Sequence, residues 1–547
     1  MLSKALLRHQ IPTIANSINL PVCFFVSIFA GYAAYSRFIY PQHLAGDRAF
    51  FVYAVVAAIA LSGVRVSYAQ ATASFRILLR SIIAFAVFYI VTCHVDIAPD
   101  LLVDKPLAAF ELNYLWVATA LCGLVAMVRP SFGVIPLLYV LWQKQQWMSV
   151  FSTPIEWMDY VTLLETGGFL ILSYLLLALF RRLGMESPLD LFGKIRSSAN
   201  ADGTISPFHP VDMLVLFAIA LHFGNYFYAG MIKATLGDSP IDWVLNNRTE
   251  LLVLAAWNNG VLPVSFHAAL PPLTYELIAN VRVVTNSFTI AIQMLAVVAI
   301  LRIRWAIAVT LCYDLLHLVI FVTTGIFFWK FILLNLAIVA ALSVIGMREI
   351  PRRMKYALAS TVVCSPLIFT ILPSFAWLDT PSVNHVQLYA VTEDGAEFPV
   401  PTSYFLGASV NLAQDRLVWP AKGPFPTETW GTTRDNTIAK AAQHCDWQRT
   451  DDAFLRSPFG LPREAIEAMV RRNHVQILSM ADENGHVDYD LFPHHIFSMP
   501  WLFRDFKRLD KRRIVAYRYE SQAVCLGYDD GRLTRQVKYS ATFDIPL

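Results

Sequence analysis

Six ionisable side chains stand within or at the ends of long apolar stretches of this sequence, and they are the residues that could do chemistry: Glu165, His222, Lys233, Asp314, His317 and Lys330. A charge near the centre of a bilayer costs at least ~2.5–3.5 kcal/mol on insertion scales, so each needs a partner or a function. Amine, imidazole and carboxylate groups exchange protons, which predicts acid–base chemistry.

Lys233 ends the stretch HFGNYFYAGMIKA and is the main candidate base. A lysine at the end of a span often extends its amine to the interface, which is the first interpretation. In the second, burial disfavours the charged ammonium and leaves an amine that can accept a proton. Tyr226 and Gly230 precede Lys233 at helical spacing on the same face, and Gly230 would let a helix or a ligand approach the backbone closely.

Asp314 and His317 are three residues apart, so they share one face of a predicted helix. Asp314 could orient His317 and raise its basicity. The alternative is an internal polar pair that only joins two helices. Trp329 and Lys330 open the next predicted helix, where they fit an interfacial anchor as well as a site.

Glu165 could pair with Lys233 or His222 if it faces the interior of the bundle, or it could bond a threonine or the backbone. The seven cysteines show no metal-binding spacing, and His494-His495 also lack it. We therefore predict no metal site.

Composition indicates the class of protein that holds these residues. Apolar residues make up 56% of the 547 residues, charged residues 15%, and the mean hydropathy is +0.50. A soluble domain carries nearer ~25% charge, so the sequence predicts an integral membrane protein with the lipid bilayer as its main partner. The 43 basic and 40 acidic residues nearly cancel, which argues against a nucleic-acid partner.

Apolar stretches up to Trp377 approach the ~20 residues that cross a bilayer. We expect about 9–11 spans from eleven candidates, at 18–36, 50–69, 78–95, 113–128, 132–147, 159–180, 211–232, 284–301, 305–322, 327–347 and 356–377. The fourth and fifth, split at Arg129-Pro130, could form one bent unit. The stretch 251–270 is broken by Asn258-Asn259-Gly260 and is expected to be interfacial or half-inserted.

Basic residues in short loops predict the orientation, because such loops stay in the cytoplasm. With eleven spans and a cytoplasmic N-terminus, all the basic loops fall on one side; they hold Arg76 and Arg80, Arg181 to Arg196, Arg302 and Arg304, and Arg348 to Lys355. We therefore expect a helical bundle over 1–378 in the inner or cell membrane. An extracytoplasmic domain follows over 379–547.

This C-terminal domain is predicted to be small and β-rich. Alternating residues after His385 and after Arg513 indicate strands, and the Asp-Gly pairs at 394–395 and 530–531 indicate hairpin turns. Residues 462–474 predict one amphipathic helix. Cys445 and Cys525 would form a disulfide in an oxidising compartment or remain two buried thiols.

The run Tyr226-Phe-Tyr-Ala-Gly-Met-Ile-Lys233, with Trp243 ten residues later, resembles the signature of the vitamin K-dependent γ-glutamyl carboxylase superfamily. Bacterial members of that superfamily are called HTTM (horizontally transferred transmembrane) proteins. His317 followed by Gly325-Ile-Phe327 resembles its second element. The strand, acidic-Gly turn and strand over 385–400 resemble the start of its tail domain.

The resemblance implies a membrane enzyme of the carboxylase type, which forms a carbon–carbon bond. Lys233 would deprotonate a reduced quinone of the vitamin K or menaquinol type, and the oxygenated anion would take a proton from a glutamate that then adds CO₂. Asp314 and His317 would assist. Together with the buried polar residues, this gives His222, Tyr226, Gly230, Trp243 and Glu165 as the expected substrate-binding residues.

Two departures from the family keep other functions open. Met158 stands where the family has a catalytic histidine, and the polar tail is shorter than the carboxylase's. The alternative is a non-catalytic maturation protein that binds an exported peptide or a membrane protein partner. A transporter would rest only on the buried polar residues.

Overall fold

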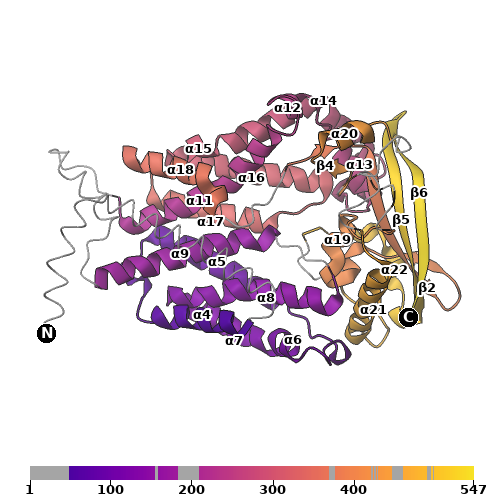
Figure 1. Ribbon diagram of the computed structural model, residues 1–547, viewed down its shortest axis with the longest axis horizontal. Helices are drawn as coiled ribbons and strands as arrows, with labels where there is room; N and C mark the ends of the chain where they lie inside the picture. The colour runs from indigo at the N-terminus through magenta and orange to yellow at the C-terminus, as the bar shows by residue number, and fades with distance from the viewer. Residues whose placement is uncertain are drawn as a thin grey trace.

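A computed structural model describes residues 49–153, 158–182, 208–368, 376–420, 423, 425, 427, 429–445, 460–489, 495–496 and 498–547. The chain is mostly helical, and a sheet built from its C-terminal part lies across one end of the helical bundle (Figure 1). The span expected at 18–36 and His494 lie outside the described residues.

The bundle is built from helices of very different length. They are α4 (Ala49–Ser62), α5 (Ala73–Thr92), α6 (Pro106–Phe110), α7 (Trp116–Ala126), α8 (Val134–Phe151), α9 (Met158–Arg182), α11 (Pro210–Lys233), α12 (Asp242–Asn246), α13 (Leu251–Asn258), α14 (Leu270–Met294), α15 (Ala296–Ala299), α16 (Ile303–Thr324), α17 (Trp329–Ile345) and α18 (Arg352–Ile368).

Five of the described helical segments are long and apolar enough to cross a membrane, which indicates an integral membrane protein. They are Ala73–Thr92, Pro106–Ala126, Leu163–Arg182, Pro210–Lys233 and Ile303–Thr324. The most apolar window of α11 is 78% buried and that of α16 only 33%, so α11 lies inside the bundle while α16 exposes one side.

Several helix boundaries differ from the predicted spans. Helix α4 ends at Ser62, before Gly63, instead of continuing to residue 69. Helix α14 begins at Leu270, well before the span expected at 284–301. The predicted span began too late because polar residues in the first turns of α14 lower the local hydropathy. The stretch 251–270 folds as the short helix α13 and a 3₁₀ turn. Extended backbone at Arg129, before Pro130, separates α7 from α8.

Gly325 sets the turn that returns the chain from α16 to α17. Its φ of +73° is in the left-handed region, and its amide donates to the Phe321 carbonyl at 2.8 Å, which closes the C-terminus of α16. A β-carbon here would lie 2.1 Å from the Val261 carbonyl oxygen. Only glycine fits, and the tight turn lets α17 pack beside α16.

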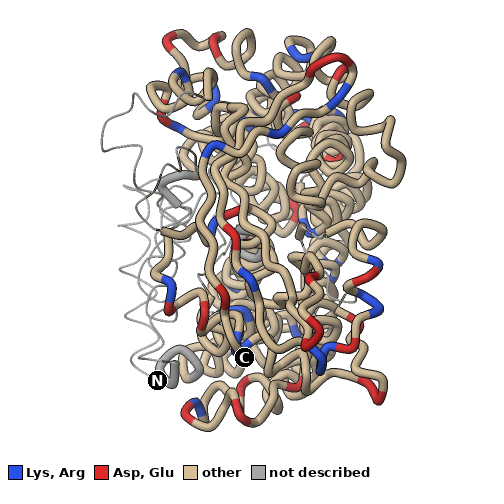
Figure 2. The backbone as a smooth tube through the Cα atoms, turned by 90° about the vertical axis from the view of Figure 1, so that its right-hand side faces the viewer, with Lys and Arg blue, Asp and Glu red and all other residues tan. Residues whose placement is uncertain are grey.

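Four antiparallel strands form the main sheet in the order β3-β2-β5-β6. They are β2 (Ser382–Thr392), β3 (Glu397–Pro399), β5 (Ile514–Asp529) and β6 (Arg532–Pro546). Asp530 and Gly531 both have positive φ in the predicted β5–β6 hairpin turn, and Gly395 does so before β3. Both predicted turns are confirmed. Viewed onto the end of the bundle, the long strands run side by side across it (Figure 2).

Short elements fill the space between sheet and bundle: α19 (Ser409–Ala413), α20 (Asn436–Ala442), α21 (Arg463–Met480), α22 (Arg504–Arg508) and a small pair of strands, β1 (Leu378–Asp379) and β4 (Thr432–Thr433). The predicted helix at 462–474 is confirmed and continues one and a half turns further as α21. Arg472 on α21 donates to the Val150 carbonyl of α8 at 3.1 Å, which joins the two regions.

A second junction joins α13 to the sheet through buried polar groups. The Asn259 side chain donates to the Asp415 carboxylate, and its amide oxygen lies 3.0 Å from Nδ1 of His385 on β2. Asp415 also accepts the Val386 amide proton at 2.9 Å. These bonds fix the C-terminal region against the bundle, so residues of both regions can contribute to one site.

Cys445 and Cys525 form a disulfide, so the bonded alternative is confirmed. The bond closes a loop of 80 residues that links the end of α20 to β5. The bond lowers the entropy of the unfolded chain, which for a loop of this length stabilises the folded protein by about 4.5 kcal/mol.

We expect the double replacement Cys445→Ser and Cys525→Ser to lower the unfolding temperature of the full-length protein in detergent, because the unfolded chain regains its loop freedom. Thermal unfolding followed by circular dichroism measures the change. Cys364→Ser, at an exposed free cysteine, is the matched control and should leave the unfolding temperature unchanged. Equal unfolding temperatures for the two variants would contradict the contribution.

Candidate functional site

One face of α11 forms the wall of a cavity of about 170 Å³. Asn225, Ala229 and Lys233 follow one another at spacings of four residues, so they lie in a row along that face, with Tyr226 beside them. Helices α12, α13, α14, α16 and α17 also contribute lining residues, and Trp377, Asp379 and Trp430 from the C-terminal region close one end.

Lys233 is buried at this cavity, with 7% of its surface exposed. Its Nζ lies 5.5 Å from the centre of the Trp243 ring, a distance at which an ammonium is attracted by the indole face. Trp243 Nε1 donates to the Trp377 carbonyl at 2.7 Å, which holds the ring in place. The structure thus buries the amine beside a cavity, and Lys233, Tyr226 and Trp243 meet there as the sequence predicted.

Asp379 faces the same cavity and was not predicted as a site residue. Asn247 binds it twice: the Asn247 amide nitrogen donates to the carboxylate at 2.7 Å, and the Asp379 backbone amide donates back at 2.9 Å. Burial raises the pKa of Asp379 to about 7, and the nearby Lys233 charge opposes the rise. The only sequence signal was a carboxylate directly after the last apolar stretch.

Asn335 on α17 is a second residue that sequence reasoning missed. Its amide oxygen lies 2.8 Å from His222 Nε2, and its amide nitrogen donates to the Tyr226 hydroxyl at 3.1 Å and to Asp314 at 2.7 Å. An amide oxygen only accepts, so His222 must donate from Nε2. One buried amide therefore connects α11, α16 and α17.

Asp314 and His317 do share a face of α16. Asp314 Oδ1 lies 3.9 Å from His317 Nδ1, whereas its shorter contact is with Asn335. His317 lines the cavity, and its ring lies against those of Phe328 and Phe331. Asp314 thus joins α16 to α17, while His317 reaches the cavity.

Stacking holds α11 against α16. The Tyr226 and Tyr313 rings lie 3.6 Å apart and almost parallel, at 6°. Gly230 permits the close approach predicted for it, because a β-carbon there would lie 3.0 Å from Cβ of Gln293 on α14. The α11 face that carries Lys233 is therefore held from two sides.

The cavity reaches the molecular surface between α14 and α16. Val319 lines it and is 42% exposed, and the lining residues Thr285 and Thr289 are half-buried. The side of α16 beside this opening is apolar, with exposed Leu315, Leu318 and Val322. An apolar molecule that enters here passes apolar side chains of α16 and the two threonine hydroxyls.

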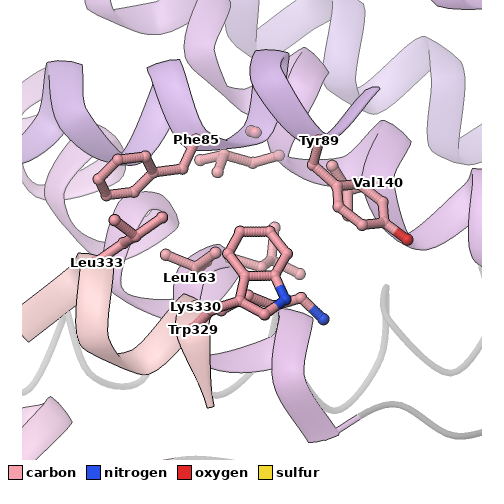
Figure 3. Close-up of a pocket in the computed structure, with 10 residues that line it drawn as sticks. Phe85, Tyr89, Val140, Leu163, Trp329, Lys330 and Leu333 are labelled. Atoms are coloured by element: carbon pink, nitrogen blue, oxygen red, sulfur yellow. The ribbon is translucent and has the colours of Figure 1, made fainter. Parts of the chain in front are cut away.

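Other predicted residues lie elsewhere. Glu165 is buried in α9 and does not line the cavity, so the structure does not bring it to Lys233. Lys330 lines a separate pocket of about 20 Å³, with Nζ 5.7 Å from the Tyr89 ring. Figure 3 shows Trp329 and Lys330 on one side of that pocket, with Phe85 and Tyr89 on the other. The side chain of Met158 lies outside the described residues.

Comparison with protein-family models, with curated proteins and with solved structures finds no match to this chain.

We expect Asn335→Leu to destabilise the protein by about 2–4 kcal/mol, because His222, Tyr226 and Asp314 would lose a buried partner. Thermal unfolding in detergent measures the loss. Ser343→Ala on the same helix is the control, since that exposed hydroxyl bonds only its own helix. A change no larger than the control's would show that Asn335 does not support the bundle.

Proposed function

We propose that this chain is an integral membrane enzyme in which Lys233 acts as a general base toward a lipid-soluble quinol, a reduced quinone of the vitamin K or menaquinol type. The single observation that carries the proposal is a buried lysine amine at the wall of an apolar cavity that opens between α14 and α16. The resemblance of residues 226–243 to the carboxylase signature points to the same lysine.

The proposed reaction begins with one proton transfer. The quinol hydroxyl loses its proton to the lone pair of Lys233 Nζ, which leaves a quinolate beside an ammonium. The Asp379 carboxylate and the Trp243 ring stabilise that ammonium. A carboxylation step after this transfer would follow from the family resemblance.

The proposal includes the orientation of the chain. We place residues 379–547 outside the cytoplasm, because the basic loops predict it and because the Cys445–Cys525 disulfide requires an oxidising compartment. Trp377 and Asp379 then close the outer end of the cavity.

We expect Lys233→Met to reduce quinolate formation at least tenfold, because the base is lost. The measurement is the absorbance of menaquinol bound to purified protein in nanodiscs without oxygen. Lys330→Met is the matched control, since it removes another buried lysine that lines a different pocket. Unchanged quinolate formation in Lys233→Met would refute the base, and absence of menaquinol binding would leave partner binding as the better function.

We expect quinolate formation to rise as pH increases through about 7, because Asp379 ionises there and its carboxylate stabilises the Lys233 ammonium. A pH titration of the same absorbance tests this. Asp379→Asn should lower the signal and remove the rise. Asp238→Asn, at an exposed carboxylate, is the control and should keep the rise of absorbance with pH. A rise that persists in Asp379→Asn would assign the titration to another group.

A further inference from the structure

Two buried amides lie on the cavity wall apart from the proposed base. Asn225 on α11 and Gln293 on α14 are 4% and 6% exposed, and both line the cavity. Three of their amide atoms have no hydrogen-bond partner among the described residues: the nitrogen and the oxygen of Asn225, and the oxygen of Gln293. Each such group costs about 1–3 kcal/mol when it stays unbonded, so the wall offers a donor and two acceptors to a bound molecule.

The two amides lie on the helix N-terminal side of Lys233. Asn225 precedes Lys233 by eight residues on α11, which is roughly 12 Å along the axis at 1.5 Å per residue. The Lys233 amine lies beside Trp243 and near Asp379, at the opposite end of this row from Asn225. Gln293 faces α11 beside Gly230, between these two levels. The cavity therefore offers the Lys233 amine at one level and unbonded amide atoms at levels closer to the N-terminus of α11.

Apolar side chains make up much of the remaining lining. They include Ile320, Phe328 and Phe331, and the cavity of about 170 Å³ holds several times the ~30 Å³ of one water molecule. An aromatic ring can be buried here while its two oxygens meet polar groups. The half-exposed Val319 marks where an apolar tail could leave between α14 and α16.

We propose that Asn225 and Gln293 form a second anchor, which holds the quinol hydroxyl that lies away from Lys233. This inference rests on the proposed function and names the residues that hold the second hydroxyl of its quinol. The hydroxyl donates to the Gln293 amide oxygen and accepts from the Asn225 amide nitrogen, so it keeps its proton while Lys233 takes the other. The site therefore selects two opposed oxygens on one apolar ring.

Two probes that differ by one oxygen test the anchor: a prenylated 1,4-naphthoquinol and the 1-naphthol with the same tail. Binding to the full-length protein in nanodiscs, without oxygen, is followed by tryptophan fluorescence. We expect the wild type to bind the diol at least tenfold more tightly than the mono-ol. Asn225→Leu and Gln293→Leu should each abolish that preference. Gln143→Leu removes a buried amide of α8 outside the cavity and should retain it.

Several results would overturn the anchor. Equal binding of both probes by the wild type refutes it, and if quinolate formation still depends on Lys233, the proposed function stands. A preference that survives in both leucine variants also refutes it. Binding of neither probe refutes both proposals. Asn225→Leu and Gln293→Leu change different helices, so the test needs only one of them to fold. Comparison of their unfolding temperatures with that of Gln143→Leu shows which variant is folded.

Discussion

The structure depends on keeping one lysine amine away from water. Lys233 is buried at the end of α11, where an ammonium loses most of its hydration. The indole face of Trp243 and the charge of Asp379 partly replace the lost hydration. The apolar cavity beside them gives a ligand access to the amine. Each of these three features comes from a different segment, so the bundle and the C-terminal region must fold together to create this environment.

The interior polar residues divide into two sets with different roles. His222, Asp314 and the Tyr226 hydroxyl converge on Asn335, and this network joins three helices behind the cavity. Asn225, Gln293 and Asp379 instead present unbonded amide or carboxylate atoms to the cavity. The first set bonds through Asn335 and joins the helices, whereas the unbonded atoms of the second set line the cavity and can bond a ligand.

The C-terminal region is part of the site as well as a cover. Its first strand carries Asp379, and Trp430 approaches the cavity from the segment before β4. The Asn259–Asp415 contact holds this region against the bundle. The Cys445–Cys525 disulfide joins two parts of the region to each other. The predicted boundary at residue 378 passes through the candidate site, because Trp377 and Asp379 both line the cavity.

The sequence by itself determined the local elements. Apolar stretches gave the long helices, the Asp-Gly pairs gave the hairpin turns, and helical spacing placed Lys233 and Tyr226 on one face. Only the tertiary structure decided which polar groups meet. Asn335 lies 113 residues from His222, and Gln293 faces Gly230 from another helix. Local periodicity carries no information about such contacts, because packing between helices distant in the chain selects them.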